Sequence, residues 1–182
     1  TMREAAAQTV HTEAFLRLYQ ALRAEGLAPV VVKGIVCRAL YPQPELRPSS
    51  DEDLYLTAAE MPRFHAVLLR AGFVLTEPER DYRSAHEARY VHPDTGLVVE
   101  GHWALFPTEY AVYAALNVQL PDLMQRAQDW ETGGVTLRVP DACDHLIFLL
   151  LHAFKHFISS GVGVRQLCDI ALWMRRFGAQ ID

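Results

Sequence analysis

The sequence predicts an α/β (α+β) fold, in which a small mixed β-sheet with flanking helices is followed by a mainly helical part. Between residues 28 and 103, short segments rich in β-branched residues alternate with segments of helical periodicity, as in helices packed on a sheet. Pro-Asp-Thr-Gly at 93–96 separates two strand-like segments and predicts a hairpin turn. Later apolar residues recur mostly at helical spacing. We expect an α/β core with an N-terminal helix over residues 1–107, and a mainly helical part over 108–182.

Composition and charge limit the class of protein. The chain has 182 residues, of which 51% are hydrophobic and 21% charged, so it can bury a core and is not a disordered tail. Its 17 Lys+Arg and 22 Asp+Glu give a net charge of -5, which argues against bulk binding of nucleic acid. Three cysteines without a C-x-x-C indicate reduced thiols. Neither a signal peptide nor a membrane-length apolar run is evident. We therefore expect a soluble, cytoplasmic protein with no membrane partner.

The first segments predict a helix, a strand, a helix and a loop. Apolar residues at helical spacing predict a helix over 11–25. The run containing Val-Val-Val predicts a buried strand over 28–32. A short helix is expected over 35–41, because Pro42 ends it, and the proline-rich residues 42–50 predict a loop.

The next segments predict the rest of the sheet. Asp-Glu-Asp-Leu-Tyr-Leu at 51–56 predicts a strand, and the apolar face of 58–71 predicts an amphipathic helix. A short strand is expected over 73–75. The two sides of the predicted hairpin are 89–92 and 97–103.

The second half predicts helices around one further strand, over 133–139. Asp141 is the expected N-cap of the strongest of these helices. The predicted helices cover residues 108–117, 122–128, 142–157 and 164–176.

Three acidic residues stand out as candidates for a metal site. Asp51 and Asp53 are two positions apart in a predicted strand, so both carboxylates point to one face about 6.5 Å apart. That spacing suits shared divalent ions about 4 Å apart. Glu100 lies in the apolar hairpin strand, where a lone carboxylate is costly without a cation or a donor. Hard oxygen ligands favour Mg²⁺ or Mn²⁺ over zinc.

A possible phosphate-binding turn precedes these residues. Lys33 and Gly34 end the first predicted strand and lead directly into a helix. A glycine there allows close approach of a phosphate to the backbone, and the start of the following helix attracts anions.

This ordered set resembles the nucleotidyltransferase superfamily that includes DNA polymerase beta and the aminoglycoside nucleotidyltransferases. A closer resemblance is to a large bacterial family of uncharacterised nucleotidyltransferase-like proteins. It covers roughly residues 28 to 175, and family members are usually longer, which implies that a C-terminal part is missing. The motifs that carry it are Lys33-Gly34, Leu40-Tyr41-Pro42, Arg47, Asp51-Glu52-Asp53-Leu54, Glu100-Gly101-His102-Trp103, His152 to His156 and Arg165 to Asp169.

The resemblance implies a nucleotidyltransferase-type sheet and transfer of a nucleoside monophosphate from a nucleoside triphosphate (NTP) to an unidentified small-molecule or protein acceptor. Two Mg²⁺ or Mn²⁺ ions would be held by Asp51, Asp53 and Glu100, with Glu100 a ligand or the acceptor for the hydroxyl proton. The implied nucleotide-binding residues are Lys33, Gly34, Arg47, Ser50 and Lys155.

Two departures from the family pattern keep other functions open. Ile35 stands where the superfamily usually has Ser or Gly, and Glu100 stands where Asp is usual. These departures favour a nucleotide-binding pseudoenzyme or regulatory domain of the same fold. A metal-dependent phosphohydrolase and a purely structural partner domain are further alternatives.

Several polar residues allow two interpretations. His152 and His156 share a helix face, with Lys155 nearby. Together with His102, these histidines either line the expected active-site cleft or are hydrogen-bonded and partly buried. Arg47 either neutralises phosphate or pairs with Glu45 or Glu52.

Two further groups are expected to be structural or exposed. Arg165 and Asp169 are spaced for a salt bridge within one helix. His86, Glu87 and Arg89 are interpreted as surface charges before the hairpin.

Overall fold

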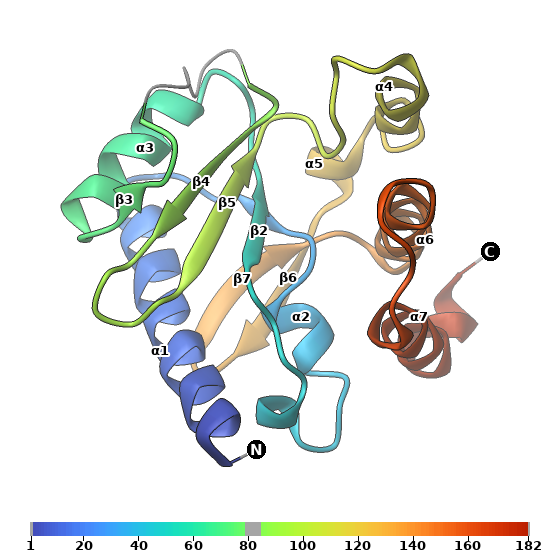
Figure 1. Ribbon diagram of the computed structural model, residues 1–182, viewed down its shortest axis with the longest axis horizontal. Coiled ribbons are helices and arrows are strands. Elements are labelled where there is room, and N and C mark those ends of the chain that lie inside the picture. The colour runs from blue at the N-terminus through green and yellow to red at the C-terminus, as the bar shows by residue number, and fades with distance from the viewer. Residues whose placement is uncertain (1, 79–84, 182) are drawn as a thin grey trace.

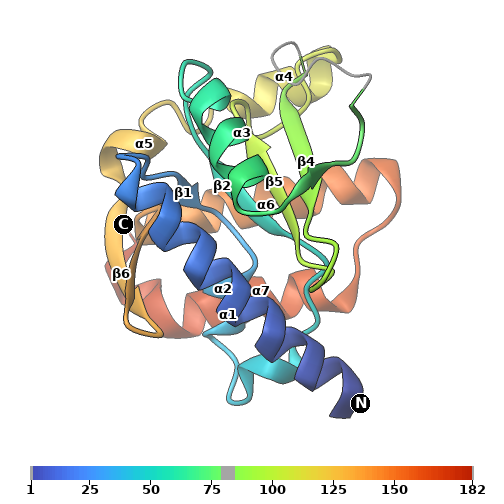
Figure 2. The same ribbon diagram turned by 90° about the vertical axis from the view of Figure 1, so that its left-hand side faces the viewer.

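A computed structural model describes residues 2–78 and 85–181 and contains a seven-stranded mixed sheet. Its strands lie in the order β3-β4-β5-β2-β1-β7-β6. Helices α1 and α3 lie on one side of the sheet, and α6 and α7 lie on the other (Figures 1 and 2). The strands are β1 (Val30–Val31), β2 (Glu52–Tyr55), β3 (Val74–Leu75), β4 (Glu87–Val91), β5 (Val98–His102), β6 (Gln128–Thr132) and β7 (Val135–Val139).

The helices confirm the predicted α/β class with a helical C-terminal part. Their bounds are α1 (Met2–Ala24), α2 (Ile35–Arg38), α3 (Met61–Arg70), α4 (Ala111–Asn117), α5 (Leu123–Arg126), α6 (Ala142–Ser159) and α7 (Val164–Phe177), with 3-10 turns η1 (Pro44–Leu46) and η2 (Gly178–Gln180). Asp141 caps α6 as expected, accepting a hydrogen bond from the Asp144 backbone N–H. Among the described residues, none of the helices has both the length and the apolar character needed to cross a membrane.

The sheet differs from the sequence prediction at its β6–β7 side. The helix predicted over 122–128 ends at Arg126, and Gln128 already begins β6. Gly133 and Gly134 both have positive φ angles, which a two-residue hairpin turn requires. The resulting hairpin places β7 parallel to β1, so a segment beyond residue 107 belongs to the same sheet as the first strands.

The register of the central strands positions the acidic residues. Strand β2 pairs in parallel with β5, and Asp53 lies opposite Glu100. Strand β1 pairs antiparallel with β2 and ends just before Lys33. Because side chains alternate along a strand, Asp53 faces one side of the sheet and Glu52 faces the other.

The core joins the N-terminal helix to both halves of the sheet. Val30 and Val31 are fully buried, as are Phe15 and Tyr19 of α1. The Tyr19 hydroxyl donates to the Pro29 carbonyl at 2.8 Å and accepts from the Arg138 backbone N–H at 2.8 Å. Helix α1 is therefore tied to the residues before β1 and to β7.

Glu52 occupies the space behind Gly34. Its carboxylate accepts a hydrogen bond from the Ile35 backbone N–H at 2.7 Å and pairs with Arg38, and the exposed fraction of Glu52 is 1%. Gly34 has a φ of 60°, and a Cβ atom at this position would lie 2.0 Å from Glu52 Oε2. The glycine is thus required by both the backbone conformation and the buried carboxylate.

Gly34→Ala is expected to lower the free energy of unfolding by about 3 kcal/mol, measured by urea denaturation. The backbone strain contributes about 1–3 kcal/mol, and displacement of Glu52 adds to it. Gly134→Ala is the matched control, since Gly134 has a φ of 73° but no atom within 4 Å of the added Cβ. Equal losses in the two variants would contradict a role for the Glu52 contact.

Candidate active site

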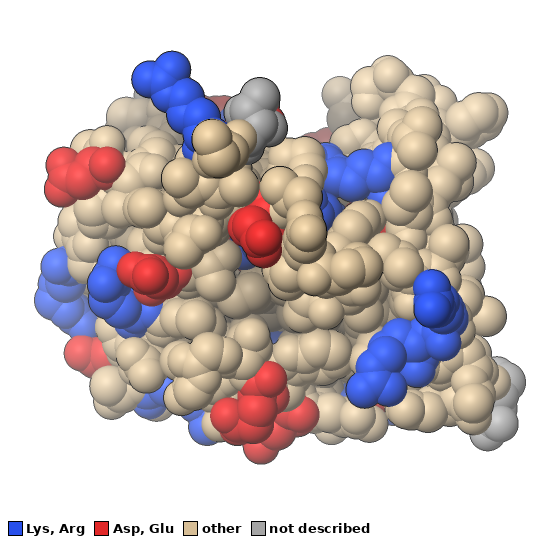
Figure 3. All heavy atoms as spheres, turned by 90° about the horizontal axis from the view of Figure 1, so that it is seen from below, with Lys and Arg blue, Asp and Glu red and all other residues tan. Residues whose placement is uncertain are grey.

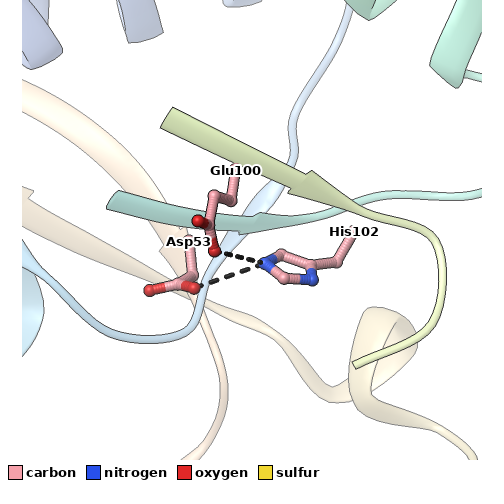
Figure 4. Close-up of side chains that lie close together, drawn as sticks. All are labelled: Asp53, Glu100 and His102. Carbon is pink, nitrogen blue, oxygen red and sulfur yellow. Dashed lines mark hydrogen bonds and ion pairs between the residues drawn. The ribbon is translucent and has the colours of Figure 1, made fainter. Parts of the chain in front are cut away.

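Three polar side chains meet where β2 and β5 run side by side. His102 Nε2 lies 3.3 Å from Asp53 Oδ1 and 3.7 Å from Glu100 Oε2 (Figure 4). Each of the three residues offers one ligand atom, and these three atoms all lie within 4.8 Å of one another. Two carboxylates and an imidazole, with Asp53 and His102 almost fully buried, form a set that suits a divalent metal ion.

Lys33 supplies a positive charge beside this group. Its Nζ lies 2.8 Å from Asp53 Oδ2 and 3.7 Å from Asp51 Oδ1. The same atom lies 3.5 Å from His152 Nε2 of α6. Asp51 is not part of the compact group of Asp53, Glu100 and His102, but the Lys33 ammonium contacts both aspartates.

The close charges shift the pKa values of the central pair. Burial opposes ionisation of Asp53, but Lys33 and His102 outweigh it and hold the Asp53 pKa well below its usual range. Burial likewise disfavours the Lys33 ammonium, yet Asp53 and Asp51 raise its pKa above the ordinary value. Both groups are therefore charged at neutral pH, as a paired ion.

The pKa values of Glu100, His102 and His152 are also shifted by burial and nearby charges. Burial, together with the charge of Asp53, raises the pKa of Glu100 to about 7. Burial acts to lower the pKa of His102, but the contacts with Asp53 and the charges of the glutamates raise it. Burial and the Lys33 charge hold the His152 pKa well below its usual value, so His152 is neutral beside the lysine.

Two adjoining cavities surround this group. The first encloses about 150 Å³ and the second about 120 Å³. Lys33, Asp51, His152 and His156 line both. Of the remaining predicted residues, Asp53, Glu100, His102 and Lys155 line the first, Arg47 and Ser50 line the second, and Gly34 lines neither.

Arg47 is held by a residue far away in the sequence. Its Nε donates to Asp169 Oδ1 at 2.9 Å and its Nη2 to Asp169 Oδ2 at 2.5 Å, with both side chains at most 5% exposed. The alternative pairing of Arg47 with Glu45 or Glu52 is wrong. The helix salt bridge predicted for Asp169 is also wrong, because Arg165 Nη1 instead donates to the Pro48 carbonyl at 2.7 Å.

Glu87 is a cavity residue that the sequence did not indicate. The interpretation of His86 and Glu87 as surface charges is wrong: His86 is 6% exposed and Glu87 lines the first cavity. Glu87 lies opposite His102 in the β4–β5 register, and its Oε2 is 3.4 Å from His102 Nδ1. The contact with His86, whose Nε2 lies 3.3 Å from Glu87 Oε2, lowers the pKa of Glu87 to about 2, which burial opposes. Only the exact hairpin register could have revealed this position.

Arg89 shares the hairpin but stays half-exposed. It lies opposite Glu100, and its Nε is 3.4 Å from Glu100 Oε1. Glu100 is therefore contacted at each carboxylate oxygen, by Arg89 on one side and by His102 on the other.

In the metal-free protein, ionisation of Glu100 is expected to lower the free energy of unfolding as the pH rises. Folded Glu100 keeps its proton up to a pKa of about 7, above the usual 4.5, so between these values the folded state binds more protons than the unfolded state. Stability then falls with rising pH. In urea denaturation with a chelator present, the free energy of unfolding of the Glu100→Gln variant should rise relative to that of the wild type from about pH 5 to pH 7. A difference that does not vary with pH would contradict this.

A family model shows the family of this chain, and two solved structures show its fold. A family model described as uncharacterised nucleotidyltransferase matches residues 2–182. The solution structure of the antibiotic-resistance factor ANT(2'')-Ia is similar with a TM-score of 0.60 at 13% identity, over 93% of this chain and 86% of that one. A nucleotidyltransferase-like protein from Paracoccidioides brasiliensis is similar with a TM-score of 0.55 at 14% identity, over 92% of this chain and 76% of that one. No curated protein sequence gives a significant match.

Proposed function

Since this chain belongs to a family of uncharacterised nucleotidyltransferases, we propose that it transfers a nucleoside monophosphate from an NTP to an acceptor. The observation that carries this proposal is the placement of Asp53, Glu100 and Lys33 around one cavity. Two neighbouring strands present the carboxylates, and the end of a third presents the lysine. Such a cavity offers both acidic ligands for a divalent metal and a cation for phosphate.

Asp51, Asp53 and Glu100 are the proposed holders of divalent ions, Mg²⁺ or Mn²⁺. When bound, such ions would neutralise the triphosphate and lower the pKa of the acceptor hydroxyl. An ion shared by Asp51 and Asp53 requires the Lys33 ammonium to give up its present contacts with these carboxylates. Lys33 is then free to contact a phosphate oxygen, which is the role we propose for it.

The second cavity is the proposed place of the phosphates. Ser50 and Arg165 line it together with Lys33, so hydroxyl and cationic groups face the same space. Arg47 Nη1 is buried there without a hydrogen-bond partner among the described residues, although Asp169 holds the rest of its guanidinium. We propose that Lys155, Gly34 and Arg47 border the nucleotide rather than grip the reacting phosphate.

The acceptor is proposed to be a small molecule or a protein side chain. Figure 3 shows Lys and Arg interspersed with Asp and Glu on one face, without a continuous basic track. The net charge of -5 also opposes binding of a long polyanion. Free thiols at Cys37, Cys143 and Cys168 fit a reducing compartment, and we propose a cytoplasmic location.

A nucleotide-binding protein without turnover is the second candidate. The Ile35 backbone N–H already donates to Glu52. The carboxylate of Glu52 therefore occupies the anion-binding position at the start of α2. This arrangement removes one donor that a phosphate would use.

Calorimetric titration with ATP, GTP, CTP and UTP, with and without Mg²⁺, tests the proposal. The wild type is expected to bind at least one nucleotide in a Mg²⁺-dependent manner, and Asp51→Asn/Asp53→Asn is expected to lose that binding. Pyrophosphate release with candidate acceptors separates an enzyme from a pseudoenzyme, and phosphate release without an acceptor would indicate a phosphohydrolase. Absence of Mg²⁺-dependent binding in the wild type would contradict both nucleotide-binding functions.

A further inference from the structure

We propose that His102 is a nitrogen ligand of the site's metal ion, that Glu87 orients it, and that the site therefore prefers Mn²⁺ to Mg²⁺. The inference rests on the proposed function only in requiring a divalent ion at these residues. It adds a ligand of a different chemical kind to the acidic set and names a residue, Glu87, that positions it.

The atoms around His102 Nε2 lie near the spacing of ligands to one ion, within 4.8 Å of one another. Two ligands each about 2.1 Å from a metal lie roughly 3.0–3.4 Å apart in octahedral or tetrahedral geometry. His102 Nε2 is 3.3 Å from Asp53 Oδ1 and 3.7 Å from Glu100 Oε2. Small side-chain adjustments are enough to place one ion between the three atoms.

Glu87 lies beside the nitrogen of His102 that faces away from the two carboxylates. Its Oε2 lies 3.4 Å from His102 Nδ1, on the side of the ring opposite the two carboxylates. In the structure Nε2 donates to Asp53 Oδ1, and Nδ1 is buried without a hydrogen-bond partner among the described residues. When an ion takes the place of the Nε2 proton, the proton that stays on Nδ1 faces Glu87. Metal-binding histidines commonly have such a carboxylate behind them, which sets both the tautomer and the ring orientation.

The surroundings hold Glu87 in place for this task. His86 Nε2 lies 3.3 Å from the same Glu87 oxygen, and the β4–β5 register sets Glu87 directly opposite His102. Lys33 contacts the other oxygen of Asp53, Oδ2. An ion at Oδ1 therefore leaves the Lys33–Asp53 pair intact.

The donor set determines the metal preference. Mg²⁺ is a hard ion that favours oxygen ligands and retains its waters, whereas imidazole nitrogen favours transition-metal ions. Replacing one oxygen ligand by the His102 nitrogen therefore improves binding of Mn²⁺ relative to Mg²⁺.

Pulsed electron paramagnetic resonance of bound Mn²⁺ tests the inference, because it detects a coordinated ¹⁴N nucleus directly. We expect a nitrogen signal in the wild type, and calorimetry is expected to show Mn²⁺ binding about tenfold or more tighter than Mg²⁺. His102→Gln should remove the signal and reduce the preference for Mn²⁺. Glu87→Gln should keep the signal but weaken Mn²⁺ binding about 10–100-fold. His11→Gln is the matched control, since His11 lies on α1 and contacts Thr95.

Bound Mn²⁺ without a nitrogen signal in the wild type would overturn the inference, whatever the variants do. An unchanged preference in a folded His102→Gln protein, checked by circular dichroism, would also overturn it, as would a lack of Mn²⁺ binding. The first two results leave nucleotidyl transfer intact, since oxygen ligands alone would serve it. A nitrogen signal without any nucleotide binding would instead contradict the proposed function and support the metal site.

Discussion

Asp53→Asn is expected to weaken Mg²⁺-dependent nucleotide binding by about 100-fold or more. Asp53 is the residue on which the site converges, since one of its oxygens contacts Lys33 and the other contacts His102. The amide carries no charge, so it neutralises neither cation and is a poor ligand for a hard metal ion. Asp51→Asn is expected to cost only about tenfold, because Asp51 lies farther from Lys33, at 3.7 Å. Calorimetry with the nucleotide that the wild type prefers gives both values.

Asp94→Asn is the control for this pair, since Asp94 is an exposed residue in the β4–β5 turn. It should bind nucleotide as the wild type does. Equal, small effects of the Asp53 and Asp51 substitutions would contradict the central place of Asp53. Wild-type binding in both variants would favour a structural partner domain, in which the carboxylates have no ligand.

Arg47→Ala is expected to lower the free energy of unfolding by about 3–5 kcal/mol, the usual result of leaving one member of a buried ion pair without its partner. The reason is Asp169, which the substitution would leave buried and charged beside Tyr41, whose hydroxyl donates to Asp169 Oδ1 at 2.7 Å. Urea denaturation provides the measurement. The double variant Arg47→Met/Asp169→Leu should recover most of the loss, because it removes both charges and keeps apolar volume.

An exposed ion pair gives the comparison for Arg47. Arg70 contacts Glu25 with both side chains more than half exposed, and Arg70→Ala should change the free energy of unfolding by less than about 1 kcal/mol. If Arg47→Ala were equally mild but abolished nucleotide binding, the pair with Asp169 would be incidental to stability and the place of Arg47 beside the nucleotide would stand.

Sequence patterns predicted the elements that depend on interactions between residues close in the chain, such as caps, helical spacing and turns. Helix α6 could be predicted because Asp141 caps it and its apolar residues follow helical spacing. The hairpin of β4 and β5 could be predicted from its turn residues. Strand β6 was missed because the polar residues around Trp130 give no clear period, and what holds them extended is the pairing of Gln128 through Thr132 with β7.

The candidate site likewise contains residues that local sequence patterns predict and residues that only the fold brings together. The spacing of Asp51 and Asp53 and the isolation of Glu100 are visible in the sequence, since they depend on strand alternation and on the cost of a buried charge. The pairing of Arg47 with Asp169 spans more than a hundred positions, and nothing near either residue indicates the other. Glu87 depends on the register of a hairpin, in which a shift of one residue would turn its side chain to the opposite face.

The position of β1 between β2 and β7 has a consequence for biosynthesis. Strand β1 ends at Val31, but the strand that covers one of its edges, β7, begins only at Val135. Until that segment has left the ribosome, the nascent chain presents an unpaired apolar strand edge next to the future site of Lys33. Exposed edges of this kind recruit other strands, and a contact between residues so distant in sequence forms late. We therefore expect ribosome-bound chains that end before residue 135 to need chaperone protection, and to acquire protease resistance only after the β6–β7 hairpin has been released.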